Sequence, residues 1–214
     1  MYFPPCTPAH TKSNSRASGA TLQSPTAAPC LALVRRCVRD QYDRPILGHA
    51  NFCPGMLDTD PAAFQGELST AVHELVHALG FSSGSWPLFR IADGTPATAR
   101  ESDGLPATES VTCVDGSTRQ ETAVSPSTLV VETSARGTVV NKLVTPRAVA
   151  VARDIFGCDT LDGVELENQP TSVGSCRGSH LEQRIFMTDF MASTSGKYSV
   201  YSPLAFAVLE DSGW

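Results

Sequence analysis

The chain has 214 residues, a net charge of −6 and an isoelectric point near 5.3, with 41% hydrophobic and 18% charged residues. This composition is that of a globular protein with enough chain for one large domain. Because the charge is acidic and no dense Lys/Arg cluster occurs, we expect no nucleic-acid partner and no binding to anionic membrane surfaces.

We expect no targeting signal at either end of the given sequence. Residues 1–6 lack the charged-then-apolar order of a secretory signal, and Glu210 and Asp211 interrupt the apolar character of residues 204–214. No run reaches the roughly 18 apolar residues of a spanning helix. We therefore expect membrane attachment only through segments absent from this chain.

Seven scattered cysteines, none of them in a Cys-x-x-Cys pair, favour an oxidising compartment and therefore a secreted or cell-surface protein. The odd number leaves at least one thiol without a partner inside the chain. Cys37 and Cys53 flank a segment that contains a turn, and we predict that they form a disulfide. A second disulfide is predicted between Cys158 and Cys176.

The predicted elements begin after a low-complexity start. Residues 1–29 are crowded with Ser, Thr, Ala and Pro and are expected to form a disordered lead-in to residues 30–214. Residues 46–52 predict a short strand. Asp60-Pro61 then predicts the start of a helix that Gly80 ends. Within this helix we expect four residues to form a buried stripe, because they recur at helical spacing: Val72, Leu75, Val76 and Leu79.

The second half of the chain is richer in turns. Residues 111–124 predict a hairpin around Asp115-Gly116, and residues 129–144 predict another around Arg136-Gly137. A helix is expected from Thr145-Pro146 to Gly157, and a last helix from Ser202-Pro203 to near Gly213.

The segment His73-Glu74-Leu75-Val76-His77 carries the strongest chemical signal. Residues four apart on a helix lie one turn apart on the same side, so both imidazoles can bind one metal ion. Glu74 points away from this axis and can act as the base that takes a proton from a metal-activated water. The alternative is a helix whose two histidines only border the core.

A catalytic zinc site usually has three protein ligands and one open position. The short form of this motif places the third histidine six residues after the second, where this chain has Ser83. Glu101 and Glu109 are carboxylate candidates in loop-like sequence. His180 is the histidine candidate, with 102 residues between it and His77.

The chain resembles the leishmanolysin family of surface metalloproteases. The similar segments are residues 73–82 around the His-Glu-x-x-His motif, Gly-Ser-His at 178–180, Phe-Met-Ala at 190–192, and residues 39–45, 51–54, 156–158, 161–168 and 209–214. The resemblance covers about residues 30–214. In that family an insertion separates the second and third histidines, which implies His180 as the third zinc ligand and Met191 as the methionine of a turn below the metal.

The resemblance implies an α+β, metzincin-like fold, with a twisted sheet, an active-site helix and a C-terminal subdomain, and with zinc in the cleft between. The active-site helix would fall within residues 30–81, and the loop-rich insert and C-terminal subdomain within 82–214. By this resemblance we expect residues 30–214 to be the catalytic core without the cysteine-rich domain that follows in the family. The implied function is a zinc-dependent metalloendopeptidase with one catalytic Zn²⁺ and Glu74 as general base, together with a role in cell adhesion.

The expected partners are protein or peptide substrates bound in extended form along residues 46–52. The alternative is a catalytically weak or inactive surface adhesion protein that keeps the protease fold. Other residues have two readings each: His49 as a ligand or a strand residue, Tyr198 or Tyr201 as an oxyanion donor or a packed surface residue. Glu182 is a candidate to orient the His180 ring.

Overall fold

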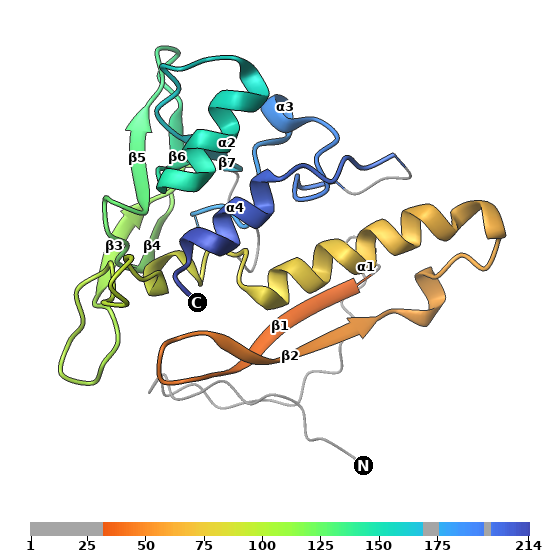
Figure 1. Ribbon diagram of the computed structural model, residues 1–214, viewed down its shortest axis with the longest axis horizontal. Coiled ribbons are helices and arrows are strands. Elements are labelled where there is room, and N and C mark those ends of the chain that lie inside the picture. Colours follow the sequence, from red (N-terminus) through yellow and green to blue (C-terminus); the bar gives the residue numbers. More distant parts are fainter. Residues whose placement is uncertain (1–31, 169–175, 195–197) are drawn as a thin grey trace.

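The computed structural model describes residues 32–168, 176–194 and 198–214, so the lead-in predicted for residues 1–29 lies outside the described part of the chain. Helices and small antiparallel sheets share the molecule, as expected for an α+β fold (Figure 1). In place of one twisted sheet, the described strands form two two-stranded sheets and one three-stranded sheet. None of the described helices is long and apolar enough to cross a membrane.

The first part is a ribbon of two antiparallel strands with a long helix against it (Figure 1). Strand β1 (Ala32–Arg39) pairs with β2 (Pro45–Phe52), which contains the strand predicted at residues 46–52. Helix α1 (Phe64–Leu79) follows two short 3-10 turns, Pro54–Met56 and Pro61–Ala63. Asp60 caps the second turn, because its carboxylate accepts a hydrogen bond from the Ala62 N–H at 2.8 Å.

Gly80 ends α1 as predicted. Its φ of 130° lies in the region that favours glycine, and a Cβ there would overlap the ring of Trp214. The C-terminal end of α1 therefore packs directly against Trp214.

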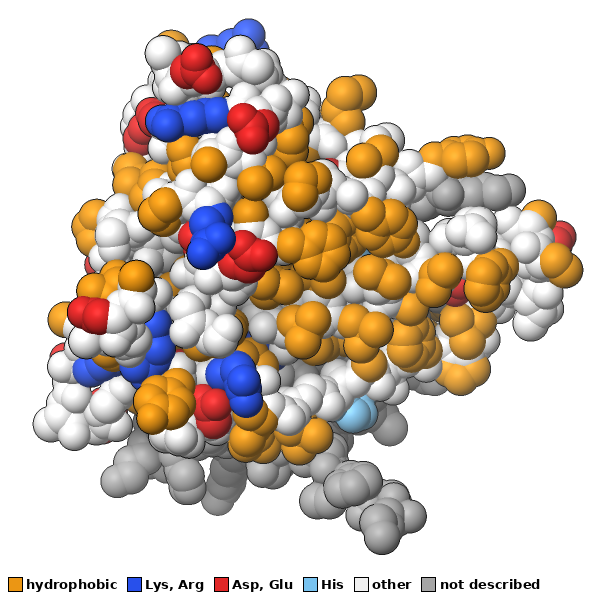
Figure 2. Space-filling model, in the orientation of Figure 1, with side chains coloured by type: hydrophobic (Ala, Val, Ile, Leu, Met, Phe, Trp, Pro, Cys, Tyr) orange, Lys and Arg blue, Asp and Glu red, His pale blue; other side chains and the backbone are white. Residues whose placement is uncertain are grey.

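The buried face of α1 differs from the predicted stripe. Val76 is buried, but Leu75 and Leu79 are 55% and 57% exposed. The helix instead buries its histidine side, through Ser69, Thr70 and His73, because the C-terminal segments pack there. Figure 2 shows hydrophobic side chains gathered on one face of the molecule. The large apolar side chains left exposed on α1 and on helix α4 (Leu204–Asp211) are Phe64, Leu68, Leu75, Leu79 and Phe206.

The two predicted hairpins are present. Strands β3 (Thr108–Thr112) and β4 (Thr118–Thr122) form the first, and β5 (Leu129–Thr133) and β6 (Val139–Leu143) form the second. The short strand β7 (Val164–Leu166) adds antiparallel to β6. Helices α2 (Pro146–Phe156) and α4 (Leu204–Asp211) were also predicted, whereas β1, β7 and the four-residue α3 (Gln183–Phe186) were not.

The hydrophobic core lies between the β5–β6–β7 sheet, α2, α4 and the loops at residues 81–89 and 181–192. Its largest fully buried side chains are Trp86, Phe81, Phe89 and Phe190. Four aromatic rings make successive edge-to-face contacts, with 5.3–5.7 Å between ring centres: Phe81, Trp86, Phe89 and Trp214. This chain of rings fixes the loop that follows α1 against the C-terminal helix.

Both predicted disulfides are wrong. Cys113 pairs with Cys176, and both Cys53 and Cys158 are free thiols. Cys37 is disulfide-bonded, but not to Cys53. The strand register explains the error: Phe52 lies opposite Ala32, so Cys53 lies beyond one end of the ribbon and Cys37 near the other. At about 3.3 Å per residue they are roughly 16 Å apart, too far for a disulfide.

Candidate metal centre

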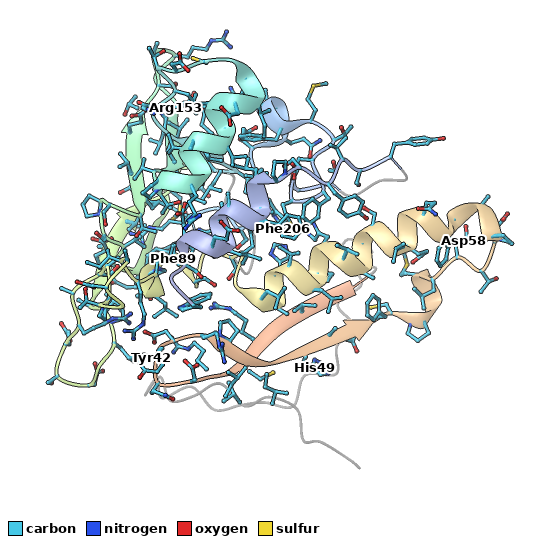
Figure 3. The ribbon with its side chains drawn as sticks, viewed as in Figure 1. Tyr42, His49, Asp58, Phe89, Arg153 and Phe206 are labelled. Atoms are coloured by element: carbon cyan, nitrogen blue, oxygen red, sulfur yellow. A yellow bond between two sulfur atoms is a disulfide. The ribbon has the colours of Figure 1, made fainter. Side chains whose placement is uncertain are left out.

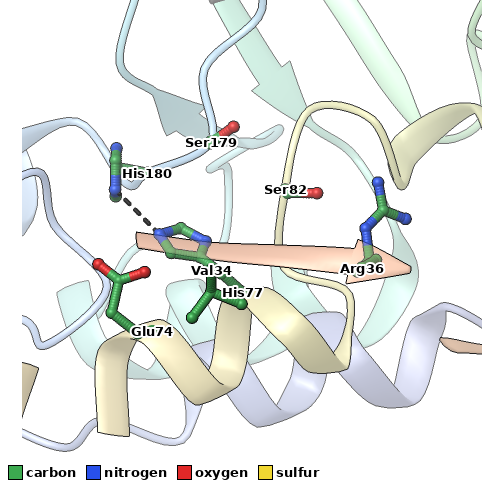
Figure 4. A pocket seen from close by; sticks show the side chains of 7 residues that line it. All are labelled: Val34, Arg36, Glu74, His77, Ser82, Ser179 and His180. Carbon is green, nitrogen blue, oxygen red and sulfur yellow. Dashed lines mark hydrogen bonds between the residues drawn. The ribbon is translucent and has the colours of Figure 1, made fainter. Parts of the chain in front are cut away.

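Three histidines from two distant parts of the chain meet beside α1. His73 and His77 stand one helical turn apart, and His180 comes from the segment that pairs with the end of β7. The Nε2–Nε2 distances are 2.9 Å for His73–His77, 3.0 Å for His77–His180 and 3.2 Å for His73–His180. Figure 4 shows His180 facing His77 across this centre.

The other nitrogen of each ring has an acceptor. Nδ1 of His73 donates to the Phe190 carbonyl and Nδ1 of His77 to the Phe81 carbonyl, both at 2.6 Å. A carbonyl can only accept, so both rings carry their proton on Nδ1 and leave the Nε2 lone pair free. Nδ1 of His180 lies 2.6 Å from Oε1 of Glu167, another acceptor.

Electrostatics keep the two helix histidines neutral. Burial is the main effect that lowers the pKa of His73. Burial, followed by the charges of His73 and His180, lowers the pKa of His77 to about 3. The Nε2 atoms of His73, His77 and His180 therefore converge, and neither His73 nor His77 carries a proton on Nε2. Metal–nitrogen bonds of about 2.0–2.1 Å in tetrahedral geometry need nitrogens about 3.3 Å apart, so this donor set fits a divalent metal ion.

A pocket of about 440 Å³ opens beside this centre (Figure 4). It is lined by Val34, Arg36, Glu74, His77, Ser82, Ser179 and His180. Glu74 is half-buried, and its carboxylate turns toward His180 in Figure 4. Burial raises the pKa of Glu74, and this effect is opposed by His180 and by a hydrogen bond from the Val34 N–H. Glu74 is therefore a carboxylate beside the three histidines that is not one of the converging donor atoms.

Glu167, not Glu182, contacts the His180 ring. Oε1 of Glu167 also accepts a hydrogen bond from the Ser179 N–H at 3.2 Å. Glu182 instead caps α3, where its carboxylate accepts from the Arg184 N–H at 3.1 Å. Gly178 makes the arrangement possible, because a Cβ at that position would overlap the backbone of Glu167. Gly178 therefore allows the segment before His180 to pack closely against Glu167.

Met191 is fully buried, in a segment that joins both halves of the centre. The Leu181 N–H donates to the Met191 carbonyl at 2.9 Å, next to His180. The neighbouring Phe190 carbonyl accepts from His73. Asp189 holds the turn, since its Oδ1 accepts from the Met191 N–H at 2.9 Å.

The remaining candidates lie away from the three histidines. His49 is exposed on β2, on the side away from α1 in Figure 3. Tyr198 is 81% exposed, and Tyr201 packs on Phe190 at 5.0 Å between ring centres. Among the carboxylate candidates, Glu101 is exposed and Glu109 pairs with Arg177. The Ser83 hydroxyl accepts a hydrogen bond from the Ser179 hydroxyl at 3.0 Å.

A helix with His-Glu-x-x-His, a third histidine and a carboxylate beside an open pocket is the arrangement of a metallopeptidase. Residues 21–214 match the leishmanolysin family of M8 peptidases, and the chain belongs to this family. Membership implies a bound metal.

Three relatives illustrate how far the similarity extends. A leishmanolysin-like peptidase of Drosophila pseudoobscura pseudoobscura is 40% identical over 80% of this chain and 25% of its own length. The ciliated left-right organizer metallopeptidase of Mus musculus is 29% identical over 86% of this chain and 23% of its own. Leishmanolysin of Leishmania chagasi is 29% identical over 66% of this chain and 17% of its own length. The chain therefore spans about a quarter or less of the length of these relatives.

Proposed function

We propose that this chain is the catalytic part of a zinc-dependent metalloendopeptidase, with residues 30–214 as the catalytic core. His73, His77 and His180 would hold one Zn²⁺, and Met191 would form the buried floor of the site. The observation that carries the proposal is the convergence of three Nε2 atoms within 3.2 Å of one another, each ring having an acceptor at Nδ1.

Zinc, when bound, supplies a Lewis acid that polarises the peptide carbonyl and lowers the pKa of water. Glu74 takes a proton on its carboxylate and later delivers it to the departing amine. Burial supports this role, because a raised carboxyl pKa lies closer to neutral pH than that of an exposed glutamate. Glu167 and the Phe190 and Phe81 carbonyls keep the imidazoles in one orientation and one tautomer.

The substrate is a protein or peptide in extended form, and the pocket favours β1 as the strand beside it. Val34 and Arg36 of β1 line the pocket, whereas residues 46–52 of β2 do not. Among the described strands β1 pairs only with β2, and the Val34 N–H points to Glu74. A peptide added along this edge would bind through backbone hydrogen bonds, which allow many sequences.

The family and the cysteine usage support a cell-surface or secreted location and an additional role in adhesion. The alternative, an inactive adhesion protein with a protease fold, does not need a proton acceptor beside the metal ligands. Glu74 in the pocket favours the enzyme.

The test is cleavage of casein by the purified zinc-loaded chain, with and without a chelator. We expect Glu74→Gln to retain one equivalent of zinc while turnover falls by about 10³-fold or more, because the amide cannot take the proton. Near-normal turnover in this variant, or cleavage that survives full removal of the metal, would contradict the mechanism. Zinc binding without any cleavage by the unmodified chain would favour the adhesion protein.

A further inference from the structure

The pocket has a second polar end, formed by Arg36. Arg36 projects from β1 and lines the pocket with Ser82 and Ser179, while Glu74 and His180 lie at the opposite end (Figure 4). Its Nη1 is buried and has no hydrogen-bond partner among the described residues. The guanidinium is thus a donor group held in a substrate-sized pocket with unused hydrogen-bonding capacity.

The carboxylates nearest in sequence are engaged elsewhere. Asp40 pairs with Arg44 at 3.4 Å, and Asp43 pairs with Arg39, Arg90 and Arg100 at 2.9–3.3 Å. Glu74, although in the same pocket, forms no ion pair with Arg36 in the described part of the chain. The positive charge of Arg36 is therefore not neutralised by any described carboxylate.

The loop after α1 accommodates this guanidinium. A Cβ at Gly84 would lie 2.8 Å from Nη2 of Arg36, so the absence of a side chain at residue 84 leaves room for the group. The hydroxyl of Ser82 borders the same space and can donate to an anion. The Ser179 hydroxyl also lines this space, but it donates its proton to the Ser83 hydroxyl at 3.0 Å.

We propose that Arg36 determines specificity by binding an acidic side chain, Asp or Glu, of the substrate next to the scissile bond. This inference rests on the proposed peptidase function. A buried donor without a partner is costly, and a carboxylate offers a guanidinium charge-assisted hydrogen bonding and neutralises its charge. A glutamine would offer only a neutral acceptor, and a lysine would meet a like charge. A peptide bound at Glu74 and His180 can also reach this group, because all three residues line one pocket.

The experiment compares peptides of one sequence in which each position in turn is Glu, Gln or Lys, with cut sites mapped by mass spectrometry. We expect one position beside the cut at which Glu raises kcat/KM about 10–100-fold over Gln, as for a hydrogen bond to a charged group. Lys should be poorest there. Arg36→Gln should remove the preference, and Arg36→Glu should favour Lys. Arg44→Gln, an exposed arginine outside the pocket, should keep the preference.

A binding measurement separates specificity from turnover. In zinc-loaded Glu74→Gln, fluorescence polarisation should show tighter binding of the Glu peptide than of the Gln peptide, and Arg36→Gln on that background should bind both equally. Cleavage or binding with no Glu preference, or a preference that persists in Arg36→Gln, would overturn the role of Arg36 while leaving the peptidase intact. Absence of cleavage of every peptide would overturn the proposed function itself, and with it the assignment of this pocket to a substrate.

Discussion

Among single residues, Glu167 both orients the His180 ring and holds together the two backbone segments that carry Glu167 and His180. Its carboxylate accepts from the His180 ring and from the Ser179 N–H, while its own N–H donates to the His180 carbonyl at 3.0 Å. Burial raises the pKa of the Glu167 carboxyl, but the hydrogen bond from His180 and its charge oppose this and leave the pKa below its usual value. The group is therefore an anion that makes the imidazole a stronger donor to a metal.

We expect Glu167→Gln to weaken zinc binding about 10–100-fold, since the amide is a weaker acceptor for the His180 ring. Competition with a chromophoric chelator measures the affinity directly and needs no turnover. Glu182→Gln is the matched control, because that carboxylate caps α3 instead. Equal losses in the two variants would contradict the assignment.

The pH dependence of the metal-free protein follows from His77. Its pKa is about 3 when folded against about 6.5 in an unfolded chain, so the unfolded state binds the extra proton. The contribution of His77 to stability is complete above pH 6.5 and is lost as the pH falls toward 3. We expect the free energy of unfolding to decrease by up to about 1.4 kcal/mol per pH unit within this window.

Urea unfolding of the chelator-treated protein between pH 7 and 5 checks this. His77→Gln should flatten the dependence, whereas His49→Gln should retain it because His49 is exposed on β2. An unchanged slope in His77→Gln would show that other groups cause the loss of stability.

The sequence predicts those site residues whose relation is local. His73, Glu74 and His77 follow from helical spacing, because five consecutive residues on a helix have fixed relative positions. His180 required the family resemblance. Glu167 was missed because its place depends on the pairing of residues 166–167 with 180–181, a long-range register that Glu182, closer in sequence, does not share.

At the scale of elements, turn and cap signals located most helices and both hairpins. The burial of α1 was less predictable: four apolar residues at helical spacing describe an apolar face but do not say what packs there. Leu75 and Leu79 remain exposed because the described strands and C-terminal segments pack on other sides of the helix. Cysteine pairing failed for the same reason, since connectivity depends on strand register.

The disulfide between Cys113 and Cys176 joins the end of β3 to the segment that leads into His180. Its sequence separation is 63, so the chain-entropy model gives a stabilisation of about 4 kcal/mol. We expect Cys113→Ala to lose stability of this order in urea unfolding. Cys158→Ala, at a free thiol, should change little, and non-reducing peptide mapping should find Cys113 joined to Cys176 and neither of them joined to Cys158. A stable Cys113→Ala protein would contradict the pairing.

At the scale of the whole molecule, the three histidines join α1 to the C-terminal part of the chain. His77 and His180 are 103 positions apart in sequence. A metal held by both would act as a cross-link between these parts and would bind only the folded state.

We therefore expect zinc at 100 times its Kd to stabilise the protein by about 2.7 kcal/mol and raise Tm by roughly 5–10 °C. His180→Ala should lose most of this shift, because two imidazoles from one helix remain and the link to the C-terminal part is gone. His49→Ala should keep it. A full shift in His180→Ala, together with loss in His49→Ala, would move the metal to the β1–β2 ribbon.

The acceptors at Nδ1 also bear on how the site can change in evolution. Those of His73 and His77 are main-chain carbonyls, at Phe190 and Phe81. A codon change replaces a side chain but leaves a carbonyl in place, so these two hydrogen bonds survive substitution wherever the backbone path is kept. Only the acceptor of His180 is genetically variable. If the three histidines bind a metal as proposed, drift or directed evolution can adjust its affinity through residue 167 while all three histidines stay unchanged.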